Sequence, residues 1–134
     1  MSRPNDIVNT MMAKDYFSQW LGIEVLSVGK GACKLKMTVR NDMLNGFGIA
    51  HGGITYSLAD SALAFASNSH GQKAVSVETS ISHTKSLCEG NVLFAEAIQE
   101  HFSNKIAVYS VKISCKDEIV ALFKGTVYRT SKDW

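Results

Sequence analysis

One run of residues limits what this chain can fold into. From Ile54 to Asn68 the sequence is apolar around nearly the whole circumference of a helix, and between Gly52 and Gln72 the only charged side chain is Asp60. A helix of this kind is buried inside a domain rather than laid on its surface. We therefore expect the rest of the chain to supply a layer that surrounds it.

Four long strand-like runs follow this helix, and the connections between the later ones are short enough for antiparallel hairpins. The runs exceed the typical strand length of about five or six residues. Long antiparallel strands in series around one apolar helix predict an α+β fold with a curved sheet wrapped about that helix. These runs cover residues 74–83, 91–102, 106–115 and 119–130.

The part of the chain before the helix predicts a hairpin and a further helix. Residues 23–28 and 32–39 read as two strands around Lys30-Gly31, with apolar and polar side chains alternating so that one face is wet. Residues 7–21 have a loose helical spacing of apolar side chains, and Gly22 follows them. We expect a short amphipathic N-terminal helix there, packed as a flap or lid.

Composition places the chain among single-domain proteins. It has 134 residues, 46% hydrophobic and 19% charged, which is enough apolar material for one core spanning residues 1–134. The net charge of +2 comes from dispersed residues with no basic block, so nucleic-acid binding gains no support.

Several features predict a soluble cytoplasmic protein. The N-terminus lacks the sustained apolar core of a signal peptide, and the longest uncharged run, residues 43–59, contains four glycines and so argues against a membrane span. Cys33, Cys88 and Cys115 are odd in number and widely spaced, which suggests neither a disulfide framework nor a zinc site. We expect these thiols to be reduced and buried.

The start of the apolar helix is a candidate catalytic site. Glycines at 46, 48, 52 and 53 let the preceding loop turn and leave bare backbone at the helix entrance. The first turn of a helix carries N–H groups without internal partners and the positive end of the helix dipole, so it stabilises an oxygen that gains negative charge. The alternative is that His51 only caps the helix and the glycines only turn the chain.

Asp60 needs an explanation of its own, because a carboxylate on a buried helix has either a partner or a task. A hydrogen bond from a serine or threonine, or a distant lysine, would be a purely structural explanation. Asp60 lies eight residues after Gly52, which is about 12 Å along a helix. If both serve one reaction, we expect a two-fold dimer in which one subunit supplies the helix entrance and the other the acid.

These residues form a recognisable pattern, Asn-x5-His-Gly-Gly-x6-Asp. With it, the chain from about Trp20 to Arg129 resembles the hotdog-fold acyl-CoA thioesterases of the PaaI type, named for phenylacetate degradation. The resemblance implies a curved sheet around one central helix, and homodimers that pair into homotetramers. The residues that carry it are Asn45, His51, Gly52, Gly53 and Asp60, followed by Val75-Ser76-Val77 and Gly125-Thr126.

The resemblance also implies roles for individual residues. The Gly52 N–H would hold the carbonyl oxygen, with His51 and Asn45 shaping that side of the site, and Asp60 of the facing subunit would act as general base or nucleophile. Ser76, also from the facing subunit, would hold the attacking water, or it is an ordinary strand serine. The implied reaction is hydrolysis of an acyl-CoA thioester to free acid and CoA, without metal or cofactor and with His51 as a candidate to assist the leaving sulfur.

The chain departs from this family at residues 83–86, His-Thr-Lys-Ser, where relatives commonly have an aromatic residue and then a proline. His70, His83 and His101 show no ligand spacing, so solvated or structural roles are expected for them. The basic residues considered for binding CoA phosphates are Lys85, Lys105, Arg129 and Lys132. The residues considered for lining the acyl pocket are Met43, Leu44, Phe47, Tyr56, Leu63 and Phe65.

Two other functions stay open on the sequence. One is a thioesterase that acts on acyl carrier protein, which would favour a basic patch at the entrance. The other is a non-catalytic acyl-CoA binding protein that has kept the fold and lost turnover.

Overall fold

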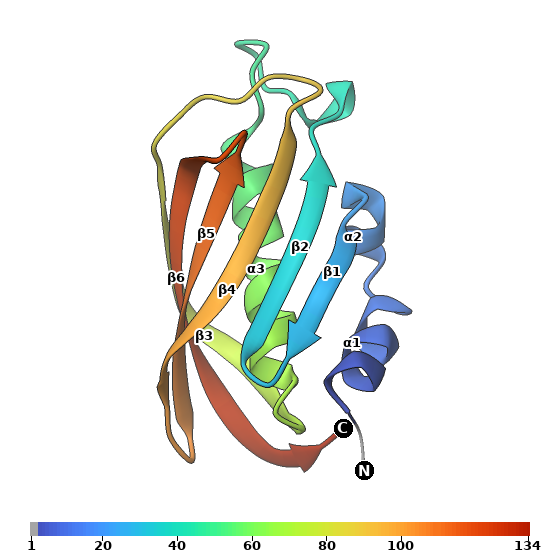
Figure 1. Cartoon of the computed structure of the whole chain (residues 1–134), viewed down its shortest axis with the longest axis vertical. Coiled ribbons are helices and arrows are strands. Elements are labelled where there is room, and N and C mark those ends of the chain that lie inside the picture. Colours follow the sequence, from blue (N-terminus) through green and yellow to red (C-terminus); the bar gives the residue numbers. More distant parts are fainter. Residues whose placement is uncertain (1–2) are drawn as a thin grey trace.

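A computed structural model describes residues 3–134, as two short helices, a six-stranded sheet and one long helix (Figure 1). The helices are α1 (Pro4–Met12), α2 (Tyr16–Leu21) and α3 (Gly52–Asn68), with a 3-10 turn at Asn41–Met43. The strands are β1 (Glu24–Gly29), β2 (Ala32–Thr38), β3 (Gln72–His83), β4 (Val92–Phe102), β5 (Ile106–Cys115) and β6 (Glu118–Asp133).

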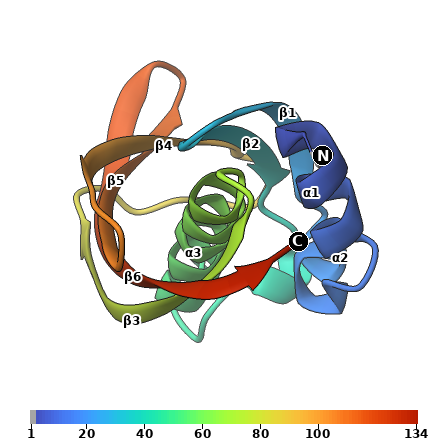
Figure 2. The same ribbon diagram turned by 90° about the horizontal axis from the view of Figure 1, so that it is seen from below.

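The sheet is antiparallel throughout and has the order β1-β2-β4-β5-β6-β3, so β1 and β3 are its edges. Seen along α3, the strands curve around the helix on most of its circumference (Figure 2). The predicted fold class, a curved antiparallel sheet wrapped around one central helix, is confirmed. This is the hotdog fold.

The core lies between α3 and the concave face of the sheet. Small side chains on α3 bring the helix close to the strands, and at Gly125 of β6 there is no room for a Cβ because Leu63 of α3 fills that space. The buried α3 residues in this contact are Leu58, Ala59, Ala62, Leu63, Phe65 and Ala66. The apolar run in the sequence is therefore buried as expected.

The predicted alternation of buried and exposed side chains holds in β2, whereas the edge strand β1 has no buried side chain on either face. Leu35 and Met37 of β2 point into the core while Lys34 is exposed. Burial raises the pKa of the Cys33 thiol to about 12, so this cysteine is an unreactive core residue. The expectation of buried thiols is wrong for Cys88, which is exposed in the turn before β4.

The N-terminal segment forms two helices where the sequence predicted one. The chain leaves the first helix after Met12, because Asp15 starts a new one by accepting hydrogen bonds from the Ser18 N–H (3.0 Å) and the Ser18 hydroxyl (2.6 Å). Gly22 then ends α2 in the left-handed conformation at φ 72°. Side-chain capping thus overrides the apolar periodicity.

Both short helices cover the side of α3 that the sheet leaves open, next to β1 (Figure 2). Ile7 and Val8 of α1 are buried here, each only 1% exposed, and the Ser18 hydroxyl of α2 bonds the Ser61 hydroxyl of α3 at 2.7 Å. The predicted flap is therefore a packed layer. Over residues 3–134, none of the helices has the length and apolar character needed to cross a membrane.

Candidate active site

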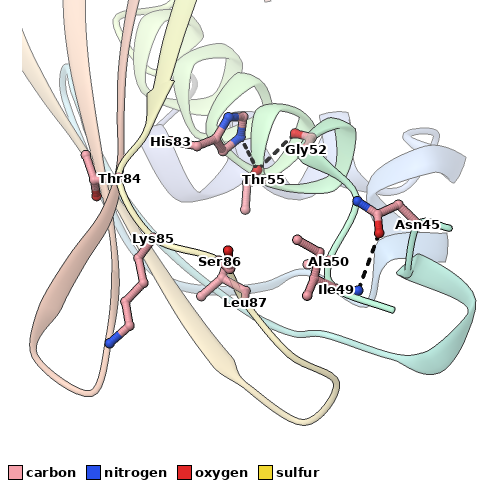
Figure 3. A pocket seen from close by; sticks show the side chains of 10 residues that line it. All are labelled: Asn45, Ile49, Ala50, Gly52, Thr55, His83, Thr84, Lys85, Ser86 and Leu87. Atoms are coloured by element: carbon pink, nitrogen blue, oxygen red, sulfur yellow. Dashed lines mark hydrogen bonds between the residues drawn. The ribbon is translucent and has the colours of Figure 1, made fainter. Parts of the chain in front are cut away.

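A cavity of about 380 Å³ opens where α3 begins (Figure 3). Three segments enclose it: the loop before the helix, the first turn of the helix, and the corner that follows β3. The lining residues are Asn45, Ile49 and Ala50 from the loop, Gly52 and Thr55 from the helix, and residues 83–87 from the corner.

Asn45 organises the loop before α3. Its side-chain oxygen accepts hydrogen bonds from the Phe47 N–H (2.9 Å) and the Ile49 N–H (3.4 Å), and its own N–H donates to the Ile49 carbonyl (2.8 Å). Gly48 allows this tight turn because it adopts φ 78°. Asn45 thus orders the loop that forms one wall of the cavity; the role in the reaction that the resemblance implies for it stays a prediction.

His51 caps α3, and the cap decides which backbone donor remains free. The His51 Nδ1 accepts the Gly53 N–H at 2.8 Å, and the Ile54 N–H donates to the His51 carbonyl at 3.0 Å. For the Gly52 N–H, the chain from residue 3 to 134 supplies no acceptor. One donor of the first turn is therefore available to a ligand in the cavity, at the positive end of the helix dipole.

His83 and Thr55 belong to this site, whereas the sequence predicts only a solvated or structural role for His83. The His83 Nε2 lies 2.7 Å from the Thr55 hydroxyl, which donates to the Gly52 carbonyl at 2.9 Å (Figure 3). The imidazole packs over Gly52 so closely that a Cβ there would lie 3.3 Å from His83 Cε1. The sequence feature that could have indicated a place for His83 in the site was the unusually polar corner at residues 83–86.

Asp60 lies outside this cavity. On α3 it is flanked by Tyr56, whose hydroxyl bonds Thr79 of β3, and by Ser61, which bonds α2. Asp60 is exposed in the single chain, which corrects the expectation that it would be buried with the rest of the helix. Its carboxylate makes no hydrogen bond or ion pair with any residue from 3 to 134.

The surroundings of Asp60 nevertheless act on its carboxyl group. Neighbouring side chains remove part of its water, and this desolvation, followed by repulsion from the Asp15 carboxylate, raises the pKa of Asp60 above the ordinary aspartate value. The structure therefore presents an unpartnered acid with an elevated pKa on the face of α3 that the sheet does not cover.

Ser76 is also exposed and also outside the cavity. It lies on the edge strand β3, opposite Val127 of β6, and a bulge follows it. The single chain thus places Asn45 and Gly52 at the cavity and His51 in the helix cap next to it, outside the cavity lining, and leaves Asp60 and Ser76 on open surface.

Only one of the four basic residues considered for CoA phosphates reaches the cavity. Lys85 lines it and extends away from the helix to bond Glu118 at 2.6 Å, a contact that raises the Lys85 pKa (Figure 3). Arg129 is buried at the other end of the molecule, where it donates to the carbonyls of Ser103 and Asn104. Lys105 and Lys132 lie at that end too.

The expected acyl-lining residues are not placed at this cavity. Met43, Leu63 and Phe65 are buried in the core, whereas Phe47 is 90% exposed. In the region that the structure covers, no group of His, Cys, Asp and Glu side chains has the arrangement of a metal site.

The fold and this cavity define the class of protein. It is a hotdog protein in which the N–H of Gly52, the first residue of the central helix, has no acceptor among residues 3–134 and lies at a polar pocket. Residues 47–122, more than half of the chain, match the sequence profile of the thioesterase superfamily. The chain belongs to the thioesterase superfamily, and it is accordingly a hydrolase that acts on thioester bonds.

Similar proteins agree with this assignment. The chain is 36% identical over 122 residues to the acyl-coenzyme A thioesterase PaaI of Escherichia coli K12, covering 90% of this chain and 87% of that protein. The structure of the E. coli PaaI protein superposes with a TM-score of 0.94 at 34% identity, over 97% of this chain and 95% of that one. A Streptococcus mutans protein bound to acetyl-CoA has a TM-score of 0.81 at 28% identity, with 84% and 91% covered.

Proposed function

We propose that this protein hydrolyses acyl-CoA thioesters to the free acid and CoA. The observation that carries the proposal is the Gly52 N–H at the start of α3, which has no acceptor among residues 3–134 and lies beside a cavity. An acyl carbonyl oxygen bound there would be polarised by the N–H and the helix dipole as it gains charge. The name of the E. coli relative and the acetyl-CoA bound to the S. mutans protein support CoA as the thiol part.

The attack on the carbonyl is assigned to Asp60 of a facing subunit. Within one chain, Gly52 and Asp60 are separated by about 12 Å of helix, too far for both to act on one carbonyl group. A two-fold dimer would give each site the Gly52 N–H of one subunit and the carboxylate of the other. The absence of any partner for this carboxylate among residues 3–134 is consistent with a task across an interface.

The edge strand β3 is the surface we assign to dimer formation. An edge strand presents unpaired backbone groups that pair readily with a second strand. Here the edge also carries exposed apolar side chains, Val75 at 55% and Val77 at 59%, on either side of Ser76. Dimers would then pair into tetramers, for which the exposed aromatic side chains Phe17 and Trp20 of α2 offer apolar surface.

Asp60 would act as a general base on water or as a nucleophile at the carbonyl carbon. A raised pKa suits the first role, because proton transfer is most efficient when the pKa of the base approaches the working pH. Ser76 of the same subunit would orient the water through its hydroxyl group. The thiol leaves readily in either case because alkyl thiols are far stronger acids than amines or alcohols.

Thiol release from a panel of straight-chain and aryl acyl-CoA esters tests the proposal. The wild type should turn over at least one ester, and Asp60→Asn and Asp60→Ala should each lower kcat by about 10²-fold or more while remaining folded and oligomeric. Saturable CoA binding without thiol release, unchanged in Asp60→Ala, would show a binding protein instead. Faster release from the same acyl group on acyl carrier protein would move the substrate from CoA to that carrier.

A further inference from the structure

The bonds of Thr55 fix the tautomer of His83. A hydroxyl group has a single hydrogen, and Thr55 donates it to the Gly52 carbonyl at 2.9 Å. The same oxygen lies 2.7 Å from the His83 Nε2, so in that contact the oxygen is the acceptor and Nε2–H is the donor. The Nε2 proton of His83 is therefore held in place by Thr55.

His83 lines the cavity, and its other ring nitrogen, Nδ1, has no such fixed partner in the described part of the chain. Across residues 3–134, no group forms a hydrogen bond with Nδ1. This nitrogen lies 3.9 Å from the point where a Cβ on Gly52 would sit, beside the N–H assigned to the carbonyl oxygen. A histidine that lines a cavity, with one ring nitrogen oriented by a fixed partner and the other without a partner, has the arrangement of a proton-transfer group.

The other ionisable groups near the cavity are committed elsewhere. The Nδ1 of His51 accepts the Gly53 N–H, so a second proton on that ring would break the helix cap. Lys85 is bonded to Glu118 at 2.6 Å. Asp60 would come from the facing subunit and would take a proton from water. His83 is the group that remains to supply one.

We propose that His83 protonates the leaving sulfur and that Thr55 is the positioning residue that orients it. This role rests on the proposed hydrolysis of acyl-CoA. After water adds to the carbonyl carbon and Asp60 takes its proton, the C–S bond breaks and its electron pair goes to sulfur. The ring acts as the imidazolium, which has taken a second proton from solvent at Nδ1 while Thr55 holds the Nε2–H; the Nδ1 proton moves to that sulfur, giving the free thiol and the neutral ring, and solvent then returns a proton to Nδ1 while Asp60 releases its proton.

The loss of a general acid that protonates the leaving sulfur lowers kcat more for a basic thiol than for an acidic one, so esters with different leaving thiols test this role. Three thioesters of one acyl group serve as probes: the CoA ester, the N-acetylcysteamine ester, whose alkyl thiol is like that of CoA but lacks the nucleotide, and the thiophenol ester, whose thiol is much more acidic. His83→Gln keeps an N–H that can reach Thr55. His101→Gln, at an exposed position on β4, is the matched control.

We expect His83→Gln to lower kcat by about 10²-fold on the CoA and N-acetylcysteamine esters, and by less than about threefold on the thiophenol ester. Thr55→Val should show the same pattern across the three esters with a smaller loss of kcat. Thr55→Ser, which keeps the hydroxyl group, should have a kcat close to that of the wild type. His101→Gln should match the wild type on all three esters. Thermal unfolding checks that each variant is folded.

Two results would overturn this role for His83. An equal loss on all three esters would mean that the ring only shapes the cavity, and no loss on any of them would mean that it takes no part. The acyl group of the three probes is the one that the wild type hydrolyses fastest in the acyl-CoA panel, and a wild type that releases thiol from no ester of that panel would overturn the proposed acyl-CoA hydrolysis and, with it, this role. A failure of the His83 assignment is therefore distinguishable from a failure of the proposed function.

Discussion

The two ends of α3 differ in whether their polar groups have hydrogen-bond partners within the chain. At the end of the helix, Asn68 uses its whole amide: the nitrogen donates to the carbonyls of Ala64 (2.8 Å) and Ala74 (3.1 Å), and the oxygen accepts from the Ala74 N–H and the Trp134 indole (both 2.9 Å). At the beginning, the Gly52 N–H and the His83 Nδ1 have no partner among residues 3–134.

The closed end continues beyond the helix into a stack of side chains. Arg129 lies over the Phe102 ring at 4.1 Å, and the His70 ring packs against Phe102, also at 4.1 Å between centroids. His70 also bonds the Gln99 side chain at 2.6 Å. Desolvation lowers the pKa of His70 despite the opposing effect of that bond. The polar side chains at this end thus have hydrogen-bond partners within the chain.

The difference separates stability from function within one helix. A polar group that is satisfied inside the chain contributes to the folded state, whereas a donor left open beside a cavity is available to a ligand. Substitutions at the closed end should therefore change the free energy of unfolding, and substitutions at the open end should change turnover.

The largest effect is expected at the open end, for Gly52→Val. The new side chain would meet the His83 ring, since even a Cβ would lie 3.3 Å from it, and it would fill the space beside the free N–H. We expect kcat/KM on acyl-CoA to fall by about 10²-fold, the typical loss for one oxyanion donor, with little change in Tm. Gly46→Val is the matched control in the same loop, because nothing lies within 4 Å of its Cβ position. Equal losses in both variants would contradict this account.

A smaller effect of the opposite kind is expected at the closed end, for Arg129→Met. This change keeps much of the side-chain volume but removes the donors to Ser103, Asn104 and Gln72. Leaving such acceptors without a partner should lower the free energy of unfolding by about 2–3 kcal/mol. Urea unfolding measures this loss, with Lys105→Met as the exposed control. A large drop in kcat per folded molecule would show that the two ends are not separate.

The smallest expected effect is a pH-dependent change in Tm for Asp60→Asn. The raised pKa of Asp60 means that the folded protein holds the proton more tightly than the unfolded chain. The protonated carboxyl therefore adds stability that is lost as pH rises through the folded-state pKa. Asp60→Asn should raise Tm at neutral pH, and the difference should vanish below the ordinary aspartate range. Asp133→Asn, at an exposed position, should not show this pattern; a lower Tm for Asp60→Asn at neutral pH would argue that the carboxylate is stabilising.

Periodicity predicted most of this fold because each long element has a simple environment. The apolar run at residues 54–68 is a buried helix, and the alternation in residues 32–39 gives a strand with one wet face. The break at residues 13–15 was missed because a local Asp15 cap outweighs the loose apolar spacing that seemed to join the two helices.

The candidate site was predicted in part, for a similar reason. Asn45, His51 and Gly52 are close in sequence, so one loop and one helix entrance bring them together. His83 reaches the same cavity through the course of β3, a placement that spacing along the chain cannot give. The exposure of Asp60 could not be predicted either, because it depends on which side of α3 the curved sheet leaves open.

The most direct test of the shared site is subunit complementation. Asp60→Asn and Gly52→Val subunits carrying different affinity tags would be co-expressed, and the mixed dimers isolated and assayed for thiol release from acyl-CoA. In a shared arrangement each mixed dimer contains one site with an intact entrance and an intact acid, so it should recover about half of the wild-type activity while both parent variants stay inactive. Mixed dimers as inactive as their parents would contradict a site built from two subunits.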